Sequence, residues 1–178
     1  MDEPSPLSPE HVTLVDTNVF ISAGNPGTSK HRRFRQVVRR AGVTLRVPGR
    51  VEEEIEQGGV TPALERAQKE GWAKIVESPT VTHSKATTAQ DIARRAIASK
   101  SAEKDEHDVE KTDPVFAGLA VEYLLDKRMA DNVTVITADR IACEAIETAI
   151  SSLGYDNQVS IITLWDLIDK EDGDITLI

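Results

Sequence analysis

Residues 12–21 read VTLVDTNVFI, and this stretch decides the fold. Four mostly apolar residues, Val12 to Val15, lead into Asp16, and the pair Thr17-Asn18 follows before an apolar run that is typical of a helix. This order predicts a buried strand that delivers one carboxylate to the edge of a sheet. Open α/β sheets bind their ligands at the carboxyl ends of their strands. The next question is therefore whether other carboxylates arrive beside Asp16.

Short apolar runs alternate with helical patterns along the rest of the chain, and this alternation indicates a parallel sheet with helices on both faces. The predicted strands are Val12–Val15, Val43–Val47, Ala73–Val76, Val133–Ile136 and Val159–Thr163. The predicted helices cover residues 28–41, 49–57, 61–70, 87–99, 113–130, 139–154 and 164–168. We therefore expect a three-layer α/β/α domain with a mostly parallel sheet of about five strands.

Length and composition fit one globular domain. The chain has 178 residues, of which 39% are hydrophobic. Residues 1–10 are rich in proline and serine and predict a flexible tail, followed by a single domain over residues 11–178. Cys143 is the only cysteine, which excludes an internal disulfide and a cysteine-rich zinc site. Because the sequence has neither a long apolar span nor a secretion signal, we expect a cytoplasmic protein without membrane contact.

The net charge of −9 argues against a polyanionic partner, but the charge is unevenly distributed. From Thr28 to Val51 there are eight basic residues and no acidic residue. Such a stretch can bind RNA locally, although a solvated helix face or a dock for an acidic partner explains it equally well. The residues considered for RNA contact are Lys30, Arg32, Arg33, Arg35, Arg39 and Arg40.

Four acidic residues stand at comparable places in the predicted fold. Asp16 ends the first strand, and Glu54 lies on the helix after the second. Asp113 opens the long apolar helix, and Asp139 follows the fourth strand. Taken singly, Asp113 and Asp139 read as helix caps, Asp16 as a turn residue and Glu54 as a solvated acid. Taken together, they predict one acidic site, because strand ends and the following helix starts share an edge of the sheet.

In this order the motifs resemble the PIN domain, a family of metal-dependent ribonucleases. The resemblance rests on a strand ending in Asp-Thr-Asn, a Pro-x-x-Val-x-x-Glu-Ile helix, an Asp opening a long helix, and a strand followed by Thr-x-Asp. It covers the chain from Val12 to about Leu164, and the long stretch 78–112 departs from it. The resemblance implies that Asp16, Glu54, Asp113 and Asp139 are the catalytic, metal-binding residues, supported by Asn18 and Thr137.

The residues themselves point to metal chemistry. Carboxylates crowded together stay ionised only when a cation lies among them. Mg²⁺ and Mn²⁺ prefer such oxygen ligands, activate water and stabilise charge on a phosphodiester. Together with the resemblance to the PIN domain, this chemistry implies an endoribonuclease that uses Mg²⁺ or Mn²⁺. A phosphatase of the haloacid dehalogenase type needs a second aspartate two residues after Asp16, where this chain has Asn18.

The biological setting stays open at this point. The enzyme fits the toxin of a toxin–antitoxin pair, with an antitoxin or another protein as partner and a homodimer as the expected assembly. The alternatives are an RNA-processing nuclease unrelated to toxins and a catalytically inactive PIN-fold module that binds RNA or protein. We expect no catalytic histidine, because His11, His31, His83 and His107 share no ligand spacing and stand in polar contexts. Trp72 and Trp165 are expected to pack at the core or its edge.

Overall fold

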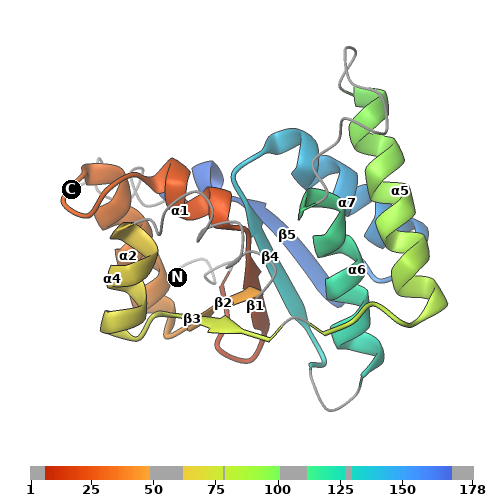
Figure 1. Cartoon of the computed structure of the whole chain (residues 1–178), viewed down its shortest axis with the longest axis horizontal. Coiled ribbons are helices and arrows are strands. Elements are labelled where there is room, and N and C mark those ends of the chain that lie inside the picture. The colour runs from red at the N-terminus through yellow and green to blue at the C-terminus, as the bar shows by residue number, and fades with distance from the viewer. Residues whose placement is uncertain (1–6, 49–61, 78, 101–111, 127–129, 170–178) are drawn as a thin grey trace, which may run out of the picture.

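The computed structural model describes residues 7–48, 62–77, 79–100, 112–126 and 130–169. The side chains of Thr17, Thr112 and Asp113 fall outside this description. The described residues form one sheet with helices on both of its faces (Figure 1). The predicted three-layer α/β/α architecture is therefore confirmed. The predicted helix at 49–57, which carries Glu54, lies outside the described residues.

The sheet has five parallel strands in the described part of the chain. Its order is β3-β2-β1-β4-β5, so the first strand is central. Every residue of β1 and of β4 is buried, which is why both read as apolar runs in the sequence. The strands are β1 (Val12–Val15), β2 (Leu45–Pro48), β3 (Ala73–Val76), β4 (Val133–Thr137) and β5 (Val159–Thr163).

Helices from the two halves of the chain cover opposite faces of the sheet, as Figure 1 shows. The first face carries α1 (Thr17–Ala23), α2 (Ser29–Ala41) and α4 (Pro62–Glu70). The second face carries α5 (Ser84–Lys100), α6 (Thr112–Leu125) and α7 (Arg140–Ser152), which pack against one another. A further helical segment, residues 164–169, follows β5. None of the helices in the described ranges is both long and apolar enough to cross a membrane.

Helix α6 is the most deeply buried helix of the second face. Residues 114–123 are all buried, because this helix is enclosed by α5, α7 and the sheet. Gly118 lies where α5 packs closely on α6. A Cβ at this position would lie 2.9 Å from Gln90 Oε1 and 3.2 Å from the Ala86 carbonyl oxygen. The absence of a side chain at Gly118 therefore permits the close packing of α5 on α6.

Aromatic side chains fill the space between the first helices and the β3 edge of the sheet. Phe34 and Trp72 meet edge to face with ring centroids 5.6 Å apart, and Phe20 lies 5.9 Å from Phe34. His31 joins this cluster with its ring centroid 5.9 Å from that of Trp72. Only 2% of His31 is exposed, so the expectation that every histidine stands in a polar context is wrong for His31.

Several element boundaries differ from the prediction. Helix α5 begins at Ser84, within a polar stretch that reads as a turn, and α6 ends at Leu125 rather than near residue 130. The early start of α5 has a tertiary cause. Glu122 of α6 accepts hydrogen bonds from the backbone N–H of Thr82 at 2.8 Å and of His83 at 3.1 Å, just before the helix begins. In the predicted tail, residues 1–6 lie outside the description, while Leu7 is buried in the core.

Candidate active site

The strand order of the sheet changes direction at β1. Strands β2 and β3 lie on one side of β1, and β4 and β5 lie on the other. The carboxyl ends of β1 and β4 are therefore neighbours at the switch point of the sheet, which lies toward the top of Figure 1. In open α/β sheets, ligands bind outside the carboxyl ends of the strands at such a point. Two of the four predicted acids, Asp16 and Asp139, follow these two strands directly.

Asp16 is fixed between β1 and the start of α1. Its backbone N–H donates to the Ile136 carbonyl of β4 at 3.3 Å, which ties it to the neighbouring strand. Its Oδ1 accepts a hydrogen bond from the Asn18 backbone N–H at 3.2 Å, so the side chain caps α1. Only 2% of Asp16 is exposed. A carboxylate held this deeply has a defined position from which to bind a ligand at the sheet edge.

Asp139 is the cap of α7, as the sequence predicts. Its Oδ1 accepts hydrogen bonds from the backbone N–H groups of Ile141 at 2.8 Å and Ala142 at 3.4 Å. Asp139 Oδ1 accepts both hydrogen bonds. Among the described residues, no group donates a hydrogen bond to Oδ2. The predicted supporting residue Thr137 is buried, and its hydroxyl accepts from the Asp139 backbone N–H at 3.3 Å. Asn18, the other supporting residue, is exposed in the first turn of α1.

The other two predicted acids are less completely described. Glu54 lies outside the described residues, and of Asp113 only the backbone, in the first turn of α6, is described. Because α6 leads into β4 of a parallel sheet, its first turn lies on the side where the strands end. Within the described ranges, no three Asp, Glu, His or Cys side chains come together in an arrangement suited to a metal ion. The predicted ligand set therefore depends on Glu54 and Asp113 as well.

Asp166 is an additional carboxylate near this edge of the sheet, and the four sequence motifs do not include it. It follows β5, the strand beside β4, and its backbone N–H donates to the Thr163 hydroxyl at 3.1 Å. Its Oδ1 accepts from Arg140 Nη2 at 3.4 Å across the start of α7. The signal in the sequence is a repeated pattern: a strand-terminal threonine precedes an aspartate after β4 and again after β5.

A family model for the Halobacterial PIN domain matches residues 9–176. The chain belongs to this PIN-domain family. The match covers nearly the whole sequence, and the resemblance inferred from four short motifs is thereby confirmed. PIN domains are generally nucleases and typically depend on divalent metal ions. No curated protein matches the sequence.

Lys30 and Trp165 lie at the rim of the acidic edge of this PIN domain. The Trp165 indole N–H donates to the Ala138 carbonyl at 2.8 Å, immediately before Asp139. Lys30 Nζ lies over the same indole, 5.6 Å from its centroid. Trp165 therefore packs at the edge, as expected, and it also brings the first turn of α2 beside the end of β4. Lys30 is exposed there as a cation near the carboxylates.

The arginines of α2 occupy different environments in the PIN domain. Arg35 forms three hydrogen bonds with the Glu70 carboxylate of α4, one from Nη2 at 2.6 Å and two from Nε at 3.0 and 3.1 Å. The Arg35 guanidinium lowers the pKa of Glu70 to about 2, and Trp72 Nε1 contributes a further hydrogen bond. Arg35 thus joins α2 to α4. Arg32 is exposed in the first turn of α2, near Lys30. Arg39 and Arg40 are also exposed, but they lie in the last turn, about 15 Å along the helix from Lys30.

Neither the cysteine nor the buried glutamate offers a second catalytic group. Burial raises the pKa of the Cys143 thiol to about 12, and Glu147 adds to the effect, so the reactive thiolate is disfavoured. Burial by itself would raise the pKa of Glu122, but hydrogen bonds from the backbones of His83 and Thr82 outweigh it and lower this pKa. The His83 ring adds a bond of 2.7 Å. Glu122 therefore holds the segment before α5 against α6.

Proposed function

We propose that this PIN domain is a metal-dependent endoribonuclease that hydrolyses RNA phosphodiester bonds at the carboxyl edge of β1 and β4. One observation carries the proposal. Within a chain of a nuclease family, Asp16 and Asp139 follow the two strands that meet at the switch point of the sheet. Ligand binding at that point is the rule for open α/β sheets.

The donor atoms available at this edge suit Mg²⁺ or Mn²⁺. Both ions prefer carboxylate oxygens and retain several water molecules. In our proposal Asp16, Glu54, Asp113 and Asp139 hold the ion, although only Asp16 and Asp139 have described side chains. When bound, such an ion activates water and stabilises negative charge on the scissile phosphate.

The chain's own residues prepare the site in defined ways. The amide hydrogen bonds to Asp139 Oδ1 fix that carboxylate at the start of α7, and Thr137 fixes the backbone beneath it. Asn18 is exposed in the first turn of α1, two residues after Asp16, and its side-chain amide can donate to a phosphate oxygen. Lys30 supplies a positive charge at the rim, which favours approach of the RNA backbone. Of the other basic residues on α2, Arg32, Arg33, Arg39 and Arg40 remain candidates for RNA contact.

The biological role belongs to the same proposal. A toxin of this type would be neutralised by an antitoxin that covers the acidic edge, and a homodimer is the assembly that we propose. An RNA-processing nuclease would use the same chemistry. An inactive RNA- or protein-binding module is the alternative candidate, and an RNA-cleavage assay separates it from the nuclease.

Cleavage of a labelled RNA pool with Mn²⁺ tests the proposal. We expect the wild-type protein to cleave, and we expect Asp16→Asn to reduce the rate by on the order of 100-fold or more. Asparagine caps helices as well as aspartate does, so this variant should fold normally. Asp131→Asn is the matched control. Asp131 is exposed just before β4, at the amino ends of the strands, whereas the proposed site lies at their carboxyl ends.

The outcomes separate the two candidates. Equal cleavage by wild type and Asp16→Asn would assign the activity to another site or to a contaminant. If the wild-type protein neither cleaves RNA nor binds Mn²⁺ in a calorimetric titration, the inactive binding module is the correct description.

A further inference from the structure

Strand β5 is an edge strand with an unusual sequence. It pairs with β4 on one side, and no strand among the described residues pairs with its other side. Proteins usually protect such edges with lysine, proline or a bulge, because free N–H and C=O groups recruit further strands. The other edge strand, β3, carries the exposed Lys74, whereas β5 reads VSIIT and has no charged residue. Half-buried Ile161 and Ile162 leave part of their apolar surface in solvent.

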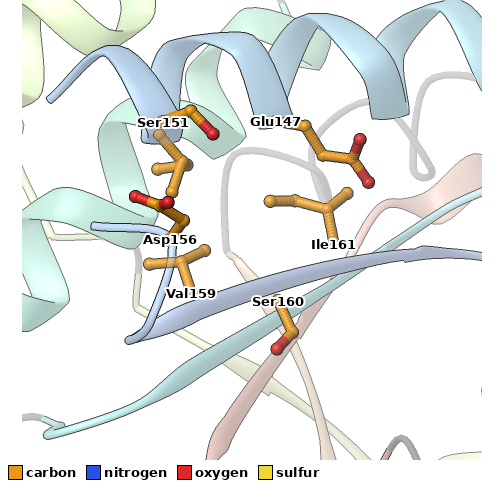
Figure 2. A pocket seen from close by; sticks show the side chains of 7 residues that line it. Glu147, Ser151, Asp156, Val159, Ser160 and Ile161 are labelled. Carbon is orange, nitrogen blue, oxygen red and sulfur yellow. The ribbon is translucent and has the colours of Figure 1, made fainter. Parts of the chain in front are cut away.

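A groove of about 360 Å³ runs along this edge between α7 and β5. Its helix wall is a stripe of Glu147, Ile150 and Ser151, three and four residues apart and therefore on one face of α7. Figure 2 shows Val159 and Ile161 of β5 pointing toward this helix, whereas Ser160 points away from it. An added strand beside β5 would place alternate side chains against the same helix stripe.

The groove is acidic at both ends. In Figure 2, Glu147 lies near Ile161 at one end and Asp156 lies near Val159 at the other. Both acids are exposed, and neither forms an ion pair with a described lysine or arginine. None of the residues that line the groove is basic. An occupant with positive charge at alternate positions along an extended chain would complement this arrangement.

We propose that the groove between α7 and β5 is a docking site for an extended basic segment of a partner protein, which adds to β5 as a further strand on the side that has no strand partner among the described residues. Backbone hydrogen bonds to β5 supply affinity in this mode of recognition, and side-chain contacts with the groove supply selectivity. The charge pattern disfavours a second copy of the chain, since pairing of two β5 edges would bring the acids of both copies together. The groove uses neither Asp16 nor Asp139, so docking is independent of the proposed catalysis.

A basic strand-forming peptide tests this proposal. The probe is a fluorescein-labelled peptide that alternates lysine and valine over about seven residues, and its counterpart has glutamate in place of lysine. Binding is followed by fluorescence anisotropy with the full chain, at the lowest salt concentration that preserves the native circular dichroism spectrum. We expect the lysine peptide to bind and the glutamate peptide not to bind.

Two double variants with the same change in net charge separate the groove from the general acidic surface. Glu147→Gln with Asp156→Asn should weaken binding by up to about fivefold for each carboxylate. Glu77→Gln with Glu65→Gln, which changes exposed acids near the β3 edge of the sheet and away from the groove, should leave binding nearly unchanged. Ile161→Lys adds a positive charge to the β5 edge and should abolish binding of the lysine peptide. In the wild-type protein, addition of the lysine peptide should shift the amide NMR signals of Ser160 to Thr163.

Three results would overturn the proposal. The first is equal binding of the lysine and glutamate peptides, or no binding of either. The second is equal weakening by the two double variants, which would show attraction to net charge alone. The third is a dimer in analytical ultracentrifugation that Ile161→Lys dissociates, because the occupant of the edge would then be a second copy of the chain.

Discussion

His31 is a buried histidine whose two ring nitrogens form no hydrogen bond of normal geometry within the part of the chain that the structure describes. Burial lowers its pKa from 6.5, and the positive charge of Arg66 acts in the same direction. Glu70 and the nearby Gly24 backbone oppose only part of this shift. The native protein therefore keeps His31 neutral, and its imidazole packs as an aromatic ring beside Trp72.

The consequence at the residue scale is a pH dependence of stability. The unfolded chain takes up a proton at the ordinary histidine pKa of 6.5, whereas the native chain takes it up only at lower pH. The unfolded state thus binds more protons in this range, so the free energy of unfolding falls as the pH falls below about 6.5. We expect urea unfolding to show this loss between about pH 7.5 and about pH 5.5.

His31→Phe keeps a ring in the cluster and removes the titrating group. The variant should lose less stability than the wild-type protein over the same pH interval. The other histidines are present in both proteins, so the difference isolates His31. Parallel pH profiles for the two proteins would contradict this account.

At the scale of single elements, the start of α7 combines a structural and a proposed catalytic role in Asp139. Asp139→Asn keeps an oxygen that accepts from the Ile141 and Ala142 amides, so we expect nearly unchanged thermal stability. RNA cleavage should still fall by on the order of 100-fold, because the charge is lost. Asp139→Ala should lose the activity and about 1 kcal/mol of stability as well. Full activity in a stable Asp139→Asn protein would show that Asp139 is only a helix cap.

The contact between α5 and α6 makes a second prediction at this scale. Gly118→Ala adds a Cβ that lies 3.2 Å from the Ala86 carbonyl, and the tip of Gln90 must also move. The strain outweighs the gain in helix propensity. We therefore expect the free energy of unfolding to fall by about 1 kcal/mol for Gly118→Ala and by about 3 kcal/mol for Gly118→Val. Adding Gln90→Ala should recover part of the loss in chemical denaturation. A higher melting temperature for Gly118→Ala would show that α5 and α6 pack less closely.

The elements also show what a sequence can predict. Strands β1 and β4 were predictable because both of their faces are buried, so their sequences are mostly apolar and carry no charge. The cap of α7 was predictable because Asp139 acts on its own two following amides. The start of α5 was not, since it depends on Glu122, which is remote in the sequence. The burial of His31 could not be predicted either. Its neighbours in the sequence, Lys30 and Arg32, are charged, and its packing partner Trp72 is remote in the sequence.

The same distinction applies to the candidate site. The position of Asp16 follows from a strand pattern and a turn, which are local features. The order of the strands places it beside Asp139, and that proximity was predictable only through the general rule for open α/β sheets. Asp166 could not be predicted as part of the site, because the short strand β5 and the short helix after it resemble an ordinary end of a domain.

At the scale of the whole molecule, metal binding should stabilise the fold if the four acids hold an ion. Mn²⁺ at about 100 times its dissociation constant adds about 2.7 kcal/mol to the free energy of unfolding. For a chain of this size, the melting temperature should rise by roughly 5–10 °C. EDTA should reverse the shift, which differential scanning fluorimetry can measure. The variant Asp16→Asn with Asp139→Asn should show little shift, and an equal shift would place the bound Mn²⁺ elsewhere on the acidic surface.

The central position of β1 has a consequence for synthesis of the chain. Val12 pairs with Val133, so the first strand leaves the ribosome long before its neighbour on one side exists. Strands β1, β2 and β3 can associate early, whereas contacts distant in the sequence form slowly and late. Asp16 is translated well before Asp139 and meets it only after β4 has been made. A nascent chain that ends before β4 is therefore without a complete acidic edge, and any nuclease activity begins only after Asp139 has been translated.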